Sequence, residues 1–174
     1  MLWLRSDNQQ TEASLCREAA ARGIDPARLV FAGALPSHAD HLARYRAADL
    51  FLDTLPYNAH VTASDALWAG LPVLTCRGRA FAGRVAASLL AAVGLSELVA
   101  DSLEEYEALA LRLAANGSPL RKFRQILEQN RLRCPLFDTD RFCRNIEAAY
   151  ETMWEDWQRG ESPRSFSVAP DQPM

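Results

Sequence analysis

Short apolar runs alternate with longer stretches of helical periodicity over most of the chain. The apolar runs, at residues 2–5, 28–32, 50–53, 72–76 and 97–100, have the length of β-strands. Helical spacing fills the stretches between them, which include residues 11–22, 37–48 and 81–93 and a helix that ends at Gly70. This alternation predicts an α/β fold in which a Rossmann-like parallel sheet is flanked by helices.

The C-terminal part of the chain has helical patterns and no strand-like run. Residues 103–114 and 120–131 are predicted as helices, and Asp138 or Thr139 is expected to cap a last one. That last helix has an apolar face: Phe142, Ile146, Tyr150, Met153 or Trp154, and Trp157. Beyond it the chain is rich in Pro and Ser and has no periodicity. We therefore expect one lobe over residues 1–158 and a disordered tail over residues 159–174.

The charge balance excludes some classes of partner. The formal net charge is −3, whereas a general nucleic-acid binder usually has a basic face. No apolar run reaches the roughly 20 residues needed to cross a bilayer, and the N-terminus lacks the pattern of a signal peptide. The four cysteines have no metal-ligand spacing. We expect buried free thiols, a cytoplasmic location, and no membrane or nucleic-acid partner.

The stretch from residue 50 to residue 76 contains the first candidate site. A parallel strand pair needs a crossover, and ligand loops gather at the carboxyl ends of such strands. Here the loop after residue 53 leads through His60, Val61 and Thr62 into a helix that carries Asp65. Free N–H groups at a helix start favour a phosphate, and Asp65 could accept hydrogen bonds from ribose hydroxyls. The alternative is that Thr62 only caps the helix and Asp65 only favours its positive end.

A second candidate lies on the helix predicted over residues 37–48. His38, His41 and Arg44 share one face of it, and His60 is the third histidine of the chain. A metal site competes with this interpretation, but no cysteine or carboxylate pair completes a ligand set. Arg44 could stack on a base or pair with phosphate, or it could be an ordinary surface arginine. The sequence contains no nucleophile–base pair and no glycine-rich phosphate loop. The residue pattern by itself therefore predicts no more than an α/β lobe with a possible nucleotide site.

A longer block of the sequence resembles a known family. The segment FAGALPSHADHLARYRAADLFLDTLPYNAHVTASDALWAGLPVLTC, followed by FAGRVAASLL, SPLRKF and CPLFDTDRF, resembles the C-terminal catalytic lobe of O-GlcNAc transferase. More broadly it is similar to the SPINDLY-type glycosyltransferases of family 41. The resemblance covers residues 2–157. It implies a glycosyltransferase with a GT-B fold, UDP-N-acetylglucosamine as donor, Ser and Thr hydroxyls of proteins as acceptors, and no metal or other cofactor.

The resemblance also implies which residues bind the nucleotide sugar. They are Leu35, Pro36, His38, His41, Arg44, His60, Val61, Thr62 and Asp65. The family pattern puts His41 beside the uracil, Arg44 on the base, and the backbone around Leu35 and Pro36 at the uracil edge. Residues 60–62 correspond to the family's diphosphate-binding His-Thr-Thr, and Asp65 to its ribose-binding aspartate.

The chain departs from the family at some of these positions. Val61 replaces a threonine, which removes a hydroxyl while its N–H remains. The turn over residues 32–39 is one residue longer, so Ser37 or His38 is the nearest match for a uridine-side lysine. Arg79 stands where a glutamate is common.

The family's N-terminal lobe and its catalytic-base candidates have no counterpart in this sequence. We therefore assign no catalytic residue, and we expect little transferase activity and at best weak UDP binding from this polypeptide without that lobe or a partner chain. Two alternatives stay open. One is a non-catalytic module that binds a UDP-sugar or packs on a partner. The other is an enzyme with a different substrate, such as a GDP-fucose glycosyltransferase or a UDP-sugar epimerase.

Overall fold

The computed structural model describes residues 1–6 and 8–168, and these form the predicted α/β fold. Five short strands are parallel to their neighbours but belong to two separate sheets. The first sheet pairs β1 (Leu2–Arg5) with β2 (Leu29–Ala32). The second has the order β3 (Phe51–Leu52), β4 (Val73–Cys76) and β5 (Val99–Ala100).

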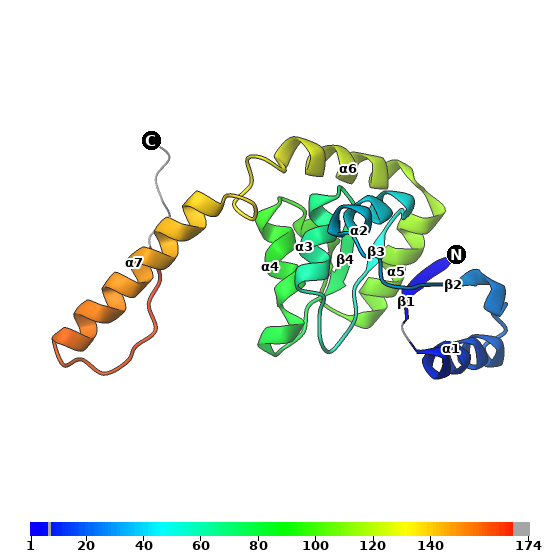
Figure 1. Ribbon diagram of the computed structural model, residues 1–174, viewed down its shortest axis with the longest axis horizontal. Coiled ribbons are helices and arrows are strands. Elements are labelled where there is room, and N and C mark those ends of the chain that lie inside the picture. The colour runs from blue at the N-terminus through cyan, green and yellow to red at the C-terminus, as the bar shows by residue number, and fades with distance from the viewer. Residues whose placement is uncertain (7, 169–174) are drawn as a thin grey trace.

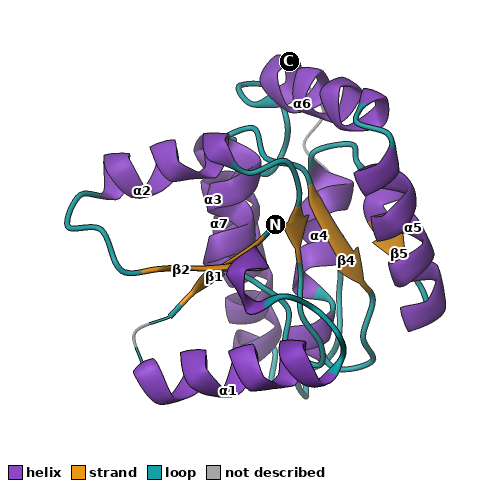
Figure 2. Ribbon diagram, turned by 90° about the vertical axis from the view of Figure 1, so that its right-hand side faces the viewer, coloured by secondary structure: helices purple, strands orange, loops and turns teal. Residues whose placement is uncertain are grey.

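Helices cover both sheets and follow the predicted ones within a few residues. They are α1 (Gln9–Ala21), α2 (His38–Arg44), α3 (Val61–Trp68), α4 (Val85–Ala92), α5 (Leu103–Ala115), α6 (Ser118–Asn130) and α7 (Thr139–Gln158). Single 3-10 turns lead into or out of these elements: η1 (Pro26–Arg28), η2 (Tyr45–Ala47), η3 (Phe81–Gly83) and η4 (Ser96–Leu98). Helix α1 lies on one face of the β1–β2 pair and α2 on the other (Figure 2).

Capping residues explain where several helices start. Ser102 accepts a hydrogen bond from the N–H of Glu105, and Asp138, rather than Thr139, accepts one from Arg141. Helix α6 begins earlier than predicted, at Ser118, because Pro119 sits in the first turn, where a missing N–H costs nothing. Strand β2 begins at Leu29 because Pro26 starts a 3-10 turn before it.

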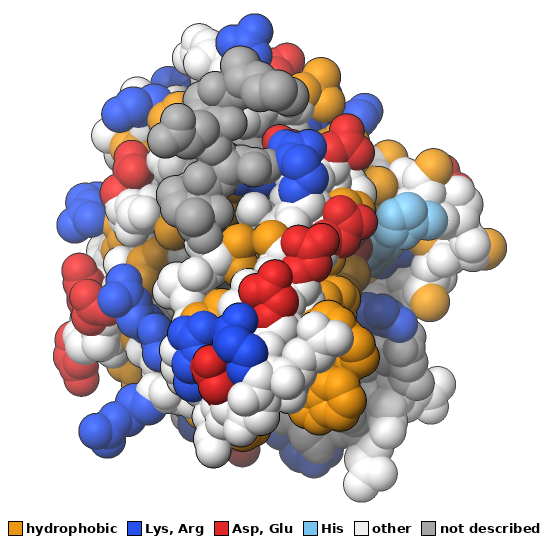
Figure 3. Space-filling model, turned by 90° about the vertical axis from the view of Figure 1, so that its left-hand side faces the viewer, with side chains coloured by type: hydrophobic (Ala, Val, Ile, Leu, Met, Phe, Trp, Pro, Cys, Tyr) orange, Lys and Arg blue, Asp and Glu red, His pale blue; other side chains and the backbone are white. Residues whose placement is uncertain are grey.

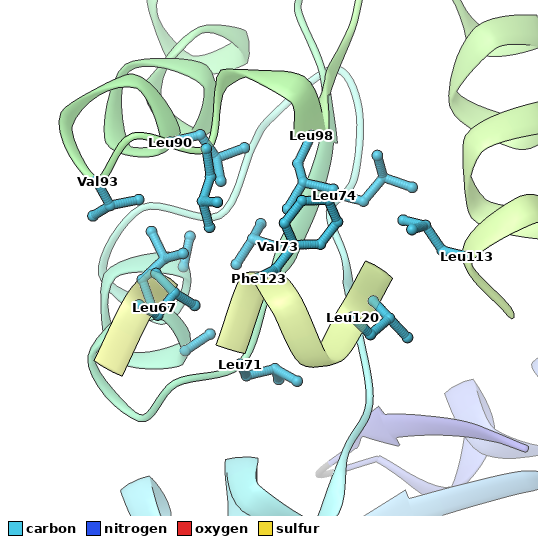
Figure 4. Packing of buried hydrophobic residues seen from close by; sticks show 14 of the residues in the cluster. Leu67, Leu71, Val73, Leu74, Leu90, Val93, Leu98, Leu113, Leu120 and Phe123 are labelled. Atoms are coloured by element: carbon cyan, nitrogen blue, oxygen red, sulfur yellow. The ribbon is translucent and has the colours of Figure 1, made fainter. Parts of the chain in front are cut away.

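The hydrophobic core surrounds the second sheet. All four residues of β4 are buried. Leu67 on α3, Leu90 on α4, Leu113 on α5 and Phe123 on α6 pack around it, as Figure 4 shows. A parallel strand with neighbours on both edges and helices on both faces excludes water from every side chain. This half of the molecule therefore supplies most of the hydrophobic stabilisation.

Helix α7 extends away from the body of the molecule (Figure 1). Its apolar face does not pack on this lobe, since Phe142, Tyr150, Trp154 and Trp157 are all more than half exposed. On the face of the molecule at the α7 end, a row of acidic side chains lies beside exposed hydrophobic ones (Figure 3). After the helix, Arg164 pairs with Asp156 at 2.9 Å and holds the following segment against α7. The expected disorder over residues 159–174 stays a prediction, and residues 169–174 lie outside the described part.

The expected state of the cysteines needs a correction. All four thiols are free, but only Cys76 and Cys134 are buried. Cys16 is half-buried on α1, and Cys143, on α7, is exposed. Over the described residues, no helix is both long and apolar enough to span a membrane.

Candidate functional site

A hollow of about 350 Å³ opens at the carboxyl end of β3. It lies where an α/β sheet usually binds its ligand, outside the ends of the strands. Its lining comes from β3, the loop that follows and the start of α3: Phe51, Leu52, Asp53, Thr54, Tyr57, Asn58, Ala59, His60 and Thr62. The wall is therefore one continuous stretch of chain, and the way that stretch is held decides the shape of the site.

Asp53, at the end of β3, holds the loop that follows this strand in place. Its buried carboxylate accepts hydrogen bonds from the N–H of Thr54 at 2.9 Å, the N–H of Ala59 at 2.7 Å and the hydroxyl of Thr75 at 2.6 Å. The hydroxyl of Tyr106, on α5, donates to the carbonyl oxygen of Asp53 at 2.9 Å. Hydrogen bonds to a carboxylate are stronger than those between neutral groups. The loop is therefore tied at both of its ends to the half of the molecule that contains the core.

The segment between β4 and α4 braces the same loop from the side. The N–H of Asn58 donates to the carbonyl of Ala82 at 2.9 Å, and Gly83 comes so close that a Cβ there would lie 2.9 Å from the Pro56 carbonyl oxygen. The ring of Tyr57 stacks on His60 with centroids 4.8 Å apart, and His60 Nε2 lies 3.4 Å from the Ala82 carbonyl. The position of His60 is therefore fixed by contacts on two sides.

The first turn of α3 leaves backbone donors uncommitted. The helix begins after His60, whose side chain makes no capping bond, and the first helical hydrogen bond runs from Ser64 to His60. No described residue accepts a hydrogen bond from the N–H groups of Val61, Thr62 or Ala63. Thr62 is the second residue of the helix, so it is not its cap. The turn thus presents free N–H groups and the positive end of a helix dipole beside the hollow.

Tyr45 joins α2 to this turn. Its hydroxyl lies 3.4 Å from the carbonyl oxygen of Thr62 and 3.4 Å from His41 Nε2, and the His41 and Tyr45 rings meet edge to face. Burial raises the pKa of Tyr45, the nearby Asp65 carboxylate raises it further, and Arg44 partly opposes the rise. His41, Arg44 and Asp65 therefore surround one phenol group at the edge of the site.

Arg44 connects three elements. It donates from Nη1 to the carbonyl oxygen of Gly33 at 3.0 Å, and its guanidinium lies over the ring of Trp3, 5.9 Å from the centroid. The contacts tie α2 to the loop after β2 and to β1. Arg44 is therefore more than a solvated surface arginine.

The structure brings together some of the predicted site residues and separates others. Val61, Thr62 and Asp65 share the start of α3, and Tyr45 brings His41 and Arg44 next to them. Leu35 and Pro36 lie exposed on the loop before α2, and the ring of His38 stacks on His41 with centroids 6.3 Å apart. His60 contacts Tyr57, Phe81 and Ala82, whereas His41 contacts His38 and Tyr45, so the three histidines do not form one cluster. No group of three possible metal ligands occurs among the described residues.

The predicted site residues did not include Asp53, Tyr45, Tyr57 and Asn58. Asp53 had a usable signal, because a carboxylate directly after an apolar run marks the ligand end of a parallel strand. Asn58 is 1% exposed, donates to the Thr54 carbonyl at 3.0 Å, and has no described partner for Oδ1. A buried acceptor without a partner, next to a hollow, marks a place where a ligand can donate a hydrogen bond.

Comparisons with known proteins agree on one family. Residues 1–146 match the model of Glycosyl transferase family 41. A curated Arabidopsis thaliana relative, "Probable UDP-N-acetylglucosamine--peptide N-acetylglucosaminyltransferase SEC", is 39% identical over 96% of this chain. A Caenorhabditis elegans UDP-N-acetylglucosamine--peptide N-acetylglucosaminyltransferase is 35% identical over 92% of it.

A solved structure gives the same result. The K341M mutant of the Thermobaculum terrenum O-GlcNAc transferase superposes on 91% of this chain with a TM-score of 0.84 and 36% sequence identity. These proteins are much longer than this chain. It spans 17% of the Arabidopsis relative, 14% of the Caenorhabditis relative and 31% of the solved Thermobaculum chain.

Proposed function

The chain belongs to glycosyltransferase family 41, and we propose that it forms the donor-binding part of a protein O-GlcNAc transferase. In this role it holds UDP-N-acetylglucosamine while the sugar passes to a Ser or Thr hydroxyl of an acceptor protein. The names of the relatives support the donor and the acceptor. We expect residues outside this chain to complete the cleft, and we expect the protein to act in the cytoplasm.

The observation that carries the proposal is the uncommitted first turn of α3. Val61 and Thr62 are exposed, their N–H groups are uncommitted, and Thr62 lines the hollow; neither residue is acidic. Several N–H groups and the positive end of a helix dipole favour a diphosphate over a neutral ligand. His60 directly precedes Val61 and is held by Tyr57 and Ala82, and its ring can donate to a second phosphate oxygen.

The nucleoside half of the donor fits the side of the site formed by α2. Asp65 lies one turn along α3, and a carboxylate there can accept hydrogen bonds from two ribose hydroxyls. His41 and Arg44 offer planar groups for a base, and the carbonyls near Leu35 and Pro36 offer acceptors for its edge. The unpartnered Oδ1 of Asn58 can receive a hydrogen bond from the ligand inside the hollow.

Holding the diphosphate also assists the transfer itself. When the bond between the sugar and the phosphate breaks, negative charge grows on the leaving UDP. Fixed N–H groups and a helix dipole aimed at that charge stabilise it more in the transition state than in the bound donor. The roles that we assign to this chain are therefore binding, orientation and stabilisation of the leaving group.

A gain-of-function variant tests the phosphate site. Val61 is 72% exposed at the start of α3, so Val61→Thr adds a hydroxyl at this turn without disturbing the core. One added hydrogen bond is worth about 0.5–1.5 kcal/mol, so we expect UDP affinity to rise about 2- to 10-fold in calorimetric titrations. Uridine affinity should not change, because uridine has no phosphate.

Matched variants locate the nucleoside side. We expect Arg44→Ala and Asp65→Asn to weaken UDP binding roughly tenfold each. The controls are Asp40→Asn, at an exposed position on α2, and Arg46→Ala, at an exposed position just after α2, and both should leave UDP binding unchanged. GDP serves as the competing ligand. Preference for GDP would favour the GDP-fucose alternative, and equal affinity across all four variants would refute this placement of the site.

A further inference from the structure

Two loops that meet beside the hollow carry exposed aromatic side chains. Tyr57 lies in the loop after β3, and Phe81 lies in the loop over residues 77–84, called the rim loop, which joins β4 to α4. Their side chains are 63% and 82% exposed. The Tyr57 ring stacks on His60, and the Phe81 ring meets His60 edge to face with centroids 6.3 Å apart. The three rings therefore form one connected row, of which Tyr57 and His60 also line the hollow.

Backbone contacts hold the rim loop in a fixed position. The N–H of Gly78 donates to the carbonyl oxygen of Gly83 at 2.6 Å, so the loop closes on itself. A Cβ on Gly83 would lie 3.1 Å from the Cα of Gly78 and 2.9 Å from the Pro56 carbonyl oxygen. The carbonyl oxygen of Ala82 accepts a hydrogen bond from the N–H of Asn58. An exposed side chain on a backbone fixed in this way loses little conformational freedom when it binds a partner.

The rim loop is also basic, and no neighbouring acidic residue in the sequence balances it. It contains Arg77, Arg79 and Arg84, and residues 77–96 include no Asp or Glu. Arg77 pairs with Asp101, with its Nε 3.4 Å from Oδ1. The guanidinium groups of Arg79 and Arg84 are exposed and have no partner among the described residues. Two cations are therefore available to a ligand, although the chain as a whole has a net charge of −3.

The position of these groups indicates what they bind. In the proposed function the diphosphate lies at the start of α3, directly after His60. Transfer needs the acceptor hydroxyl in contact with the sugar carbon that is bonded to this diphosphate. The polypeptide that carries the hydroxyl must therefore pass within about one sugar ring of His60. Tyr57 and Phe81 are the exposed neighbours of His60, so they are the side chains that this polypeptide meets.

We propose that the rim formed by Tyr57, Arg79, Phe81 and Arg84 binds the acceptor polypeptide and selects acceptors that have carboxylates and an apolar side chain next to the reacting Ser or Thr. This inference rests on the proposed function, because it takes the hollow as the donor site. Arginine clusters recognise acidic motifs through charge-assisted hydrogen bonds, and well-placed aromatic rings bind apolar side chains. Basic acceptors are rejected, since like charges then face one another.

The test titrates the ¹⁵N-labelled chain with short synthetic peptides in excess UDP and follows the NMR signals of the chain. Each peptide has a central Ser beside a Val, and its flanking positions are all Glu, all Gln or all Lys. We expect the Glu peptide to bind at least about fivefold more tightly than the Gln peptide, and the Lys peptide to bind most weakly. The shifts should centre on Tyr57, His60 and the rim loop. High salt should reduce the difference, because exposed ion pairs are screened.

Charge reversal tests the arginines. Arg79→Glu should reverse the order, so that the Lys peptide binds more tightly than the Glu peptide. Arg121→Glu is the matched control, because Arg121 is exposed on α6. On the same helix Arg124 donates to the carbonyl oxygen of Ala48, which precedes β3, so α6 lies at the other end of this strand from the rim. Arg121→Glu should therefore leave the order unchanged.

A second pair of variants tests the aromatic part of the rim. Phe81→Ser should weaken the binding of all the peptides by about threefold or more and keep their order, because it removes apolar contact area and no charge. Leu132→Ser is the control, since Leu132 is 83% exposed in the turn after α6. Equal effects of the two substitutions would overturn the assignment of Phe81 to the rim.

Failure of this inference can be distinguished from failure of the proposed function. If UDP binds while the peptides all bind equally, the inference is wrong and the proposed function stands. If the Glu peptide binds and UDP does not, the proposed function is refuted, and the peptide is no longer an acceptor. An order that Arg79→Glu does not change would overturn the inference. So would an Arg79→Gln variant that loses UDP binding as strongly as peptide binding, since Arg79 would then serve the donor.

Discussion

The two halves of this molecule contain the same kinds of element and differ in how they are buried. Strand β4 is buried at every position, whereas no residue of β1 or β2 is buried. Among the described residues up to number 50, Ala19 is the only buried one. Strand-forming sequence is thus present in both halves, and only the half with neighbours on all sides has a core.

This difference extends into the candidate site. The loop after β3 and the start of α3 are tied to the buried half through Asp53, Thr75 and Tyr106. Helix α2 belongs to the exposed half, where Arg44 holds it to Gly33, and it reaches the site through Tyr45 at its C-terminal end. We infer that the phosphate side of the site is rigid, and that the base side is held by fewer and longer contacts.

The largest expected effect is a difference in stability between core variants of the two halves. Leu74→Ala removes a fully buried side chain beside α3 and α4, and it should lower the free energy of unfolding by about 2–5 kcal/mol. Val30→Ala, at a position in β2 that is 36% exposed, should lower it by less than about 1 kcal/mol. Urea unfolding followed by circular dichroism measures both. Equal losses would mean that the first sheet is as well packed as the second.

Local signals were enough to predict the elements themselves. Apolar runs marked the strands, and the structure confirms Asp138, one of the two expected caps, at the start of the last helix. The helix beginning beside His60 was also predicted, because a polar loop after an apolar run points to the ligand end of a strand. These features depend on a few neighbouring residues, which a sequence displays directly.

What the sequence did not predict depends on residues far apart in the chain. Asp53 binds Thr75, and Tyr45 reaches the carbonyl of Thr62; neither pairing has a local signature. The division of the strands into two sheets also escaped prediction, because an apolar run shows that a strand forms and not which partners it finds. For the same reason the apolar face of α7 did not show what it packs against, and Trp154 and Trp157 are exposed in this chain.

A smaller effect is expected from a substitution that disturbs the loop after β3 and leaves α2 unchanged. Gly83→Ala would place a Cβ 2.9 Å from the carbonyl oxygen of Pro56, so the loop after β3 must shift. Overpacking of this kind costs about 1–3 kcal/mol. We expect lower stability and weaker UDP binding, with the hydrogen exchange of α2 unchanged. Gly117→Ala is the control, since its Cβ would meet only the end of the Arg121 side chain at 3.9 Å. A loss of protection in α2 would contradict the division into two sides.

The smallest effect concerns the hydroxyl of Tyr106, which holds the carbonyl of Asp53. Burial, and to a smaller extent the Asp53 carboxylate, raise the pKa of Tyr106 to about 12. Because the pKa in the folded state exceeds the unfolded value near 10, the stabilisation is complete below about pH 10 and is lost as the pH rises toward 12. Tyr106→Phe should therefore be less stable than wild type by about 1 kcal/mol at neutral pH.

That deficit should shrink when urea unfolding of the two proteins is compared at increasing pH above 10. Only ionisation of this hydroxyl distinguishes the two proteins, so other groups that titrate at alkaline pH cancel in the difference. A deficit that stays constant over this range would mean that the folded and unfolded proteins hold the proton of Tyr106 equally well. The hydroxyl would then not be held by the buried half, and the rigidity that we infer for the phosphate side would have to come from Asp53 and Thr75 alone.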